Sequence, residues 1–181
     1  MSAARVALVT GANQGLGFAL AAGLAARMNP DDLVLLTGRH ARRVADAAAA
    51  VSTRAGTRSR VLGRVLDVAD AGAVAGLAAE LADRHGGVDI VMSNAIAALL
   101  PDRPQSEQAD EFIDVANAGT HAVLRSFGPV LRPGGRLIVV ASSLGTLGHL
   151  DPRLHPLFDG ATLKEVEAAR SEERRVGKEC W

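Results

Sequence analysis

Short apolar runs alternate with longer, alanine-rich stretches over most of this sequence. Each apolar run is rich in valine, leucine or isoleucine and is bounded by turn-forming or polar residues, a pattern typical of strands buried on both faces. The stretches between the runs are long enough for helices and rich in residues that favour helix formation. The pattern predicts strands at 6–10, 33–37, 60–66, 88–93 and 136–141, and helices at 15–28, 41–54, 70–85 and 105–130.

This alternation of strands and helices predicts an α/β fold. Strand–helix–strand units are right-handed, so successive strands run parallel and the helices cover both faces of the sheet. A chain of 181 residues with 48% hydrophobic residues is large enough for one domain with its own core. We therefore expect a doubly wound parallel sheet.

The composition argues against several classes of protein. Lysine plus arginine and aspartate plus glutamate number 20 each, so no overall field favours nucleic acid or a membrane surface. No apolar run has the length of a membrane span, and the residues after Arg5 are typical of a strand rather than of a signal peptide. Cys180 is the only cysteine, which leaves no disulfide framework and no cysteine metal site. We expect a cytoplasmic protein that binds neither nucleic acid, membrane nor metal.

A glycine-rich turn follows the first predicted strand. Gly11, Gly15 and Gly17 lie between that strand and a predicted helix, with Asn13 and Leu16 among them. Glycines in this position permit a tight turn, close approach of the backbone to a pyrophosphate and close packing of the helix on the sheet. The free N–H groups of the helix then point at the phosphates. The turn predicts a dinucleotide site, and the alternative is a turn that binds no ligand.

The spacing of these glycines resembles that of the short-chain dehydrogenase/reductase family. Its Thr-Gly-x-x-x-Gly-x-Gly signature is met by Thr10, Gly11, Gly15 and Gly17, and the resemblance extends to about residue 167. It implies a Rossmann-type sheet of strand order 3-2-1-4-5, incomplete at the C-terminus of this chain. Residues 1–167 would then form a partial nucleotide-binding domain that binds the cofactor through Asn13 and Leu16 as well.

The residues after the second predicted strand indicate which dinucleotide binds. Folds that prefer NAD place an acidic residue near this point, where it binds the ribose 2′-hydroxyl. This chain has Arg39 there, with Arg43 one helical turn later on the same face. Two guanidinium groups suit a 2′-phosphate, so the sequence favours NADP, the alternative for Arg43 being a solvated helix residue.

Two further motifs fall in the order of the family. Asp67 and Val68 match its Asp-Val pair, which the resemblance places beside the adenine, although aspartate also caps helices. Asn94 matches one residue of its Asn-Asn-Ala-Gly motif, which lies along the cofactor. Ser93 and Ile96 depart from that motif, and the side chain of Ile96 stands where the family has glycine.

The resemblance implies a catalytic serine, tyrosine, lysine and asparagine. Ser143, the second serine of a pair that follows the fifth predicted strand, matches the serine that binds the substrate oxygen, the alternative being a turn. The asparagine position is Ala116, and Asn117 is one residue off, a rotation of about 100° on a helix. The 181 residues contain no tyrosine, and neither lysine lies at the family's spacing.

The whole protein is therefore expected to reduce a carbonyl, an aldehyde or ketone, to an alcohol with NADPH, as the carbonyl-reductase-like branch of the family does. This chain, without the tyrosine and lysine, is expected to be inactive. The alternatives are a non-catalytic NADP-binding module and a methyltransferase, which Arg39 disfavours. The sequence does not identify the carbonyl substrate and leaves the oligomeric state open, with a monomer among the possible states.

The last residues differ in character from the rest. Residues 162–165 have a capping-box pattern that predicts the start of a helix. Residues 168–181 are mostly charged and have no apolar stripe, and residues 170–180 resemble a translated sequencing adapter. We expect this tail to be non-native, and the alternative is a genuine charged helical tail.

Overall fold

The structure, a computed structural model, describes residues 4–142, 146–149 and 151–157. These residues fall into two compact units, the first within residues 1–96 and 115–140 and the second within residues 97–114 and 141–181. Ser143, the helix expected from residue 162 and the expected tail at 168–181 lie outside the described residues.

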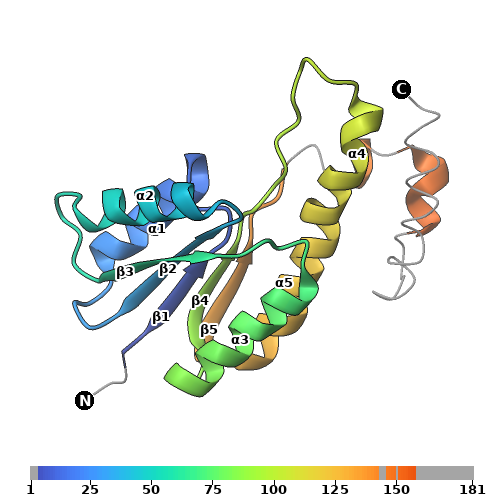
Figure 1. Cartoon of the computed structure of the whole chain (residues 1–181). Helices are drawn as coiled ribbons and strands as arrows, with labels where there is room; N and C mark the ends of the chain where they lie inside the picture. Colours follow the sequence, from blue (N-terminus) through green and yellow to red (C-terminus); the bar gives the residue numbers. More distant parts are fainter. Residues whose placement is uncertain (1–3, 143–145, 150, 158–181) are drawn as a thin grey trace. The chain divides into compact units, whose positions relative to one another are not determined.

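The first unit contains a sheet of five parallel strands in the order β3-β2-β1-β4-β5, as expected (Figure 1). The central strand β1 is buried along its whole length and pairs with β2 and β4. Leu8, for example, lies between Leu35 and Val91. The strands are β1 (Val6–Val9), β2 (Leu33–Gly38), β3 (Arg60–Val65), β4 (Val88–Ser93) and β5 (Leu131–Val139).

Helices cover both faces of this sheet. Helices α1 and α2 pack on one face, and α3 and α5 pack on the other (Figure 1). Small residues of α1, such as Ala21 and Ala25, are fully buried in the core on the first face and allow this helix to lie close to the strands. The helices of the first unit are α1 (Gly15–Arg27), α2 (Ala41–Ser52), α3 (Ala71–His85) and α5 (Thr120–Phe127), and α4 (Gln105–Ile113) belongs to the second unit.

Helix α3 shows how local sequence sets the boundaries. Asp70 was expected as the first helical residue, but it is the N-cap, and its carboxylate accepts a hydrogen bond from the Ala73 amide at 2.9 Å. Gly86 ends the helix in the left-handed conformation, at φ +74°.

Two boundaries differ from the expected ones. Strand β5 begins at Leu131 rather than at residue 136, because Leu131 pairs with Val88 before the ladder resumes at Arg136 and Ile90. The intervening residues bulge out, and Pro133 is tolerated because an edge strand does not need every N–H. The long helix expected at 105–130 contains a π-helical segment at Asp114–Gly119 and ends in a 3₁₀ turn.

The expectation that all five strands are buried on both faces is wrong for β3 and β5. Leu62 and Val65 on β3 are 47% and 58% exposed, and Ile138 and Val139 on β5 are each 41% exposed. Both strands are edges of the described sheet and pair on one side only. Such edges leave backbone N–H and C=O groups open to pairing with another strand.

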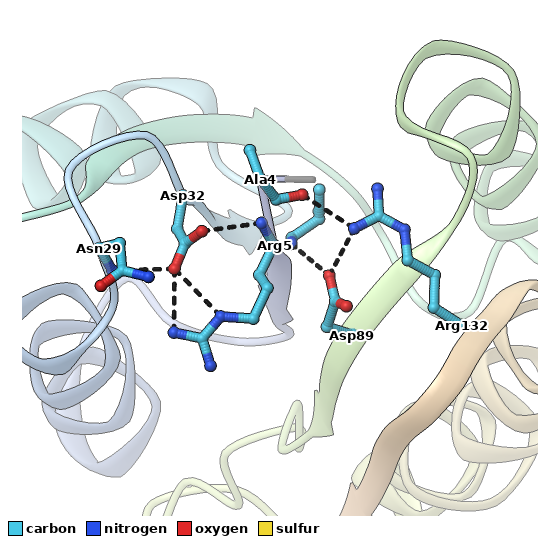
Figure 2. A network of polar contacts seen from close by, with 7 residues as sticks. Ala4, Arg5, Asn29, Asp32, Asp89 and Arg132 are labelled. Carbon is cyan, nitrogen blue, oxygen red and sulfur yellow. Dashed lines mark hydrogen bonds and ion pairs between the residues drawn. The ribbon is translucent and has the colours of Figure 1, made fainter. Parts of the chain in front are cut away.

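A network of charged side chains lies at the amino ends of β1, β2, β4 and β5 (Figure 2). The Asp32 carboxylate, nearly buried, accepts hydrogen bonds from the backbone amides of Arg5 and Asn29, each at 2.8 Å, and from the Arg5 guanidinium at 3.0 and 3.1 Å. Burial alone would raise the pKa of Asp32, but these hydrogen bonds and the charge of Arg5 outweigh it and hold the pKa below its ordinary value.

A second acid extends the network to β5. One oxygen of Asp89 accepts hydrogen bonds from the Val6 amide at 2.6 Å and from the Arg132 guanidinium at 2.9 Å. Arg132 also donates to the Ala4 carbonyl at 2.8 Å (Figure 2). It donates to the His85 carbonyl as well. The amino ends of β1, β4 and β5 are thereby tied together.

Within the described part of the chain, no helix is both long and apolar enough to span a bilayer. The same residues contain no cluster of histidine, cysteine, aspartate and glutamate side chains that fits a metal ion.

Candidate functional site

The residues expected to bind the nucleotide follow the carboxyl ends of four strands. All strands are parallel, so these ends share one edge of the sheet. The strand order reverses direction between β1 and β4, and ligands of doubly wound sheets bind outside the carboxyl ends at this switch point. The sheet thus brings the carboxyl ends of β1, β2, β3 and β4, with the motifs that follow them, to one edge.

Thr10 joins the two strands at the switch point. Its side chain is fully buried, and its hydroxyl oxygen accepts hydrogen bonds from the Asn94 and Ala95 amides at 2.9 and 3.0 Å. The side-chain amide of Asn94 in turn donates to the backbone carbonyls of Thr10 at 3.0 Å and Gly11 at 3.3 Å. Asn94 therefore fixes the backbone of the glycine turn from the neighbouring strand.

The three positions of the turn favour glycine for different physical reasons. Gly11 has φ +61°, and a Cβ there would lie 2.7 Å from the Ala95 Cα. Gly17 leaves no room either, because its Cβ would lie 2.4 Å from the Gly11 carbonyl oxygen and 2.5 Å from the Asn94 amide nitrogen. Gly15 has φ +57° with nothing within 4 Å of the Cβ position, so its Cα faces open space.

Helix α1 begins at this open side without a capping side chain. Gln14 is the N-cap residue and makes no side-chain capping bond, and the first turn contains no acidic residue. The first N–H groups of a helix have no partner within the helix and attract anions. The exposed Leu16 lies in this first turn. The turn and the start of the helix have the donors and the space that a pyrophosphate needs.

The end of β2 lies beside the glycine turn. The Ala12 amide donates to the Thr37 carbonyl at 2.8 Å, and a Cβ at Gly38 would lie 2.7 Å from the Asn13 side-chain oxygen. Asn13 therefore lies directly against the residue that precedes Arg39. Both Arg39 and Arg43 are exposed, Arg39 after β2 and Arg43 in the first turn of α2.

The end of β3 supplies one exposed and one buried residue. Asp67 is exposed, and one of its oxygens accepts a hydrogen bond from the Ala69 amide at 3.0 Å. Val68 is buried, and a Cβ on Gly119 would lie 2.7 Å from its side chain. Contacts of Val68 with a nucleotide would therefore be made by its backbone, and Gly119 allows the following helix to lie close.

Three expectations concern the catalytic side of the site. Ser143 lies outside the described residues, although Val140, three residues before it, donates its amide to the Ser93 carbonyl at 2.9 Å and so follows the end of β4. Asn117 is exposed and Ala116 is half-buried in the π-helical segment, so the two side chains have different surroundings. Ile96 is 64% exposed and has no positive φ, so its backbone is compatible with a side chain.

Sequence reasoning did not single out two small residues that the site requires. Ala95 lies against the position that a Cβ on Gly11 would take, and a Cβ on Gly38 would meet the side chain of Asn13. Both lie next to recognised motifs, in Ser-Asn-Ala and Thr-Gly-Arg. Their small size was the available signal, but only the packing of neighbouring strands shows why it is needed.

Comparisons with known proteins agree with this geometry. Residues 5–150 match the short chain dehydrogenase family. Carbonyl reductase [NADPH] 1 of Sus scrofa is 34% identical over 167 residues, which are 90% of this chain and 56% of that protein. The chain thus spans little more than half the length of this curated relative.

Solved structures show the same fold. A metagenomic short-chain oxidoreductase in complex with NADP has a TM-score of 0.66 and 25% identity, covering 80% of this chain and 65% of that chain. Salutaridine reductase from Papaver somniferum has a TM-score of 0.80 at 22% identity, covering 97% of this chain and 71% of that chain. Together, the matched residues and the strand order show that this chain belongs to the short-chain dehydrogenase family.

Proposed function

We propose that this chain binds NADPH at the carboxyl edge of its sheet, and that the whole protein uses it to reduce an aldehyde or ketone to an alcohol. The observation that carries the proposal is the open side of Gly15 beside the uncapped start of α1. The relative from Sus scrofa is named as an NADPH carbonyl reductase, which supports the same assignment.

Each region of the edge has a separate task in this proposal. The turn from Gly11 to Gly17 and the first N–H groups of α1 hold the pyrophosphate. Arg39 and Arg43 bind the 2′-phosphate, because guanidinium groups pair well with phosphate oxygens and no carboxylate replaces them at this point. Asp67 accepts a hydrogen bond from the adenine amino group, and Asn94 holds the turn in place.

The chemistry requires a hydride, which bound NADPH supplies, and a proton for the developing alkoxide. Ser143 is proposed to donate a hydrogen bond to the substrate oxygen, where such a donor stabilises charge that develops in the transition state. The 181 residues contain no tyrosine to act as the acid. The proposal for this chain is therefore nucleotide binding, and the reduction is proposed for the whole protein.

The second candidate function is a non-catalytic NADP-binding module, which gains support if the charged residues 168–181 are a genuine part of the protein. The two candidates share the nucleotide site and differ in the reaction. Oxidation of NADPH by the whole protein with a panel of aldehydes and ketones distinguishes them. Turnover that depends on Ser143 supports the reductase, whereas tight NADPH binding without turnover supports the module.

Two matched glycine variants test the nucleotide site. Gly15 and Gly56 both have positive φ, +57° and +86°, with nothing within 4 Å of the Cβ position. Alanine at either position costs about 1–2 kcal/mol in backbone strain. We expect Gly15→Ala to weaken NADPH binding at least about tenfold in a fluorescence titration, and Gly56→Ala to leave it unchanged. Equal affinities of the two variants would refute the proposed site.

A further inference from the structure

Val44, at the end of the first turn of α2, packs against two glycines of the sheet. Helix α2 lies over β2 and β3 (Figure 1), and Val44 is 2% exposed. A Cβ on Gly63 of β3 would lie 2.8 Å from the Cγ1 of Val44, and a Cβ on Gly38 of β2 would lie 3.2 Å from its Cγ2. The two methyl groups of one valine thus take the space that side chains at two strand positions would need.

Gly63 is required for space rather than for backbone conformation. It has no positive φ, and it lies in the interior of β3, paired with Leu36. Glycine weakens the interior of a strand and often marks the close approach of another segment. The Gly63 Cβ position also lies 3.1 Å from the Val44 carbonyl oxygen and 3.2 Å from the Ala48 Cβ, so the backbone of α2 itself approaches β3. Gly63 therefore sets how close α2 lies to the sheet.

Val44 has little freedom to turn away from Gly63. A β-branched side chain in a helix has one strongly preferred rotamer. Val44 also belongs to the buried core on this face of the sheet, where close packing leaves little room for another position. A methyl group added at Gly63 is therefore expected to displace the start of α2 outward rather than to turn Val44 aside.

The start of α2 is linked directly to the arginines of the proposed nucleotide site. Arg43 immediately precedes Val44, and only Arg39 and His40 connect β2 to α2. The Val44 amide donates to the His40 carbonyl at 3.0 Å, so the first turn of the helix is bonded to this short connection. A displacement of the start of α2 therefore moves the backbone of Arg39 and of Arg43. The glycine turn leads into α1, a different helix.

We propose that the close fit of Val44 against Gly63 positions Arg39 and Arg43 for the 2′-phosphate, and that Val44 and Gly63 thereby help to determine the preference for NADPH over NADH. Both are positioning residues and do not touch the cofactor. The inference rests on the proposed function for the cofactor and on the described contacts for the position of α2. Guanidinium–phosphate pairs with two parallel hydrogen bonds have a specific geometry, which makes the preference sensitive to this fit.

A double-mutant cycle in the whole protein tests the fit. Gly63→Ala adds a methyl group 2.8 Å from the Val44 Cγ1, and Val44→Ala removes that contact. The double variant has room for the added methyl group, so it should be closer to the unmodified protein than the two single effects together predict. Leu62→Ala is the control, because Leu62 is 47% exposed and its side chain points to the opposite face of β3 from Gly63.

Amide hydrogen exchange tests the packing without any cofactor. Protection of the residue 44 amide is expected to fall at least about fivefold in Gly63→Ala, to recover most of that loss in the double variant and to stay unchanged in Leu62→Ala. Purely additive effects of the two substitutions would overturn the fit. If Gly63→Ala does not fold, folding of the double variant would support the fit, and failure of both to fold would contradict it.

Cofactor titration tests the positioning role. The Kd of NADPH is expected to rise about fivefold in Gly63→Ala and to return to within about twofold of the unmodified value in the double variant, with the Kd of NADH changed less than about twofold throughout. Equal rises in both Kd values, or an unchanged Kd of NADPH, would overturn the positioning role. If the unmodified protein does not bind NADPH, the proposed function fails and the positioning role with it, whereas the exchange of the residue 44 amide still decides the fit of Val44 against Gly63.

Discussion

The two ends of the sheet use the same kinds of side chain for opposite purposes. At the amino end, the carboxylates of Asp32 and Asp89 are paired with Arg5 and Arg132 and with backbone amides (Figure 2). At the carboxyl end, Asp67, Arg39 and Arg43 are exposed, and the glycine turn has open space beside Gly15. At the amino end the charged side chains bind one another and the backbone, whereas at the carboxyl end backbone donors and charged side chains are exposed.

This difference separates stability from binding. The carboxylates of Asp32 and Asp89 at the amino end are buried or partly buried and hydrogen-bonded, so their loss leaves donors without partners and destabilises the fold. Charges at the carboxyl end are exposed, so their loss is expected to cost the fold less than it costs a bound ligand. Substitutions at the two ends should therefore change different measurements.

The largest effect is expected for Gly17→Ala. Its Cβ would lie 2.4 Å from the Gly11 carbonyl oxygen and 2.5 Å from the Asn94 amide nitrogen, so the glycine turn must shift. We expect NADPH affinity to fall on the order of a hundredfold. The matched control is Gly76→Ala on α3, where nothing lies within 4 Å and alanine should stabilise the helix by about 0.5–1 kcal/mol. Unchanged affinity in Gly17→Ala would show that the turn is not part of the site.

Asp32→Ala should have the largest effect at the amino end. It removes the acceptor for the Arg5 and Asn29 amides and for the Arg5 guanidinium. We expect the free energy of unfolding in urea to fall by about 3 kcal/mol, because buried donors lose their partner. The Kd of NADPH should not change. A variant as stable as the unmodified protein would show that the network contributes nothing to the fold.

The pH dependence of stability gives a second test of Asp32. Its pKa is lowered in the folded protein, so its contribution is fully present above the unfolded value of about 3.9 and is lost as the pH falls through the lower folded value. The unmodified protein should therefore lose stability below about pH 4 more steeply than Asp32→Ala. Urea unfolding at several pH values measures this, and parallel curves would contradict it.

The smallest effect is expected for Asp67→Ala, the same substitution at the carboxyl end. Asp67 is exposed, and its carboxylate accepts a hydrogen bond from the Ala69 amide. Stability should change by less than about 1 kcal/mol, and NADPH affinity should fall about fivefold for one lost hydrogen bond. The comparison of the two ends fails if Asp67→Ala destabilises the protein as much as Asp32→Ala does.

The sequence predicted one end of the sheet far better than the other. Gly11, Gly15 and Gly17 lie in one local turn between a strand and a helix, and this local pattern predicts the turn and motivates the proposed pyrophosphate site. The pairs Arg5–Asp32 and Asp89–Arg132 join residues far apart in the sequence, and nothing in the local pattern distinguishes these charges from solvated ones.

The misplaced boundaries have the same cause. Leu131 is in a strand because it pairs with Val88, and the proline and glycines that follow it locally favour a turn. Likewise, Gln108 on α4 is buried because its side-chain amide bonds to both backbone groups of Leu100, whereas its sequence position is that of an ordinary polar helix residue. Contacts between distant segments determined what local patterns did not.

The most direct test of the account is the preference for NADPH over NADH in the unmodified protein and in Arg39→Ala. Arg42→Ala is the control, because Arg42 lies nearby on α2 and is 96% exposed in a loose pair with Asp46. Isothermal titration should show NADPH bound about ten- to a hundredfold more tightly than NADH in the unmodified protein and in Arg42→Ala. In Arg39→Ala the preference should largely disappear through weaker NADPH binding, with NADH affinity unchanged. Equal affinity for the two cofactors in the unmodified protein, or a preference that survives in Arg39→Ala, would contradict the account.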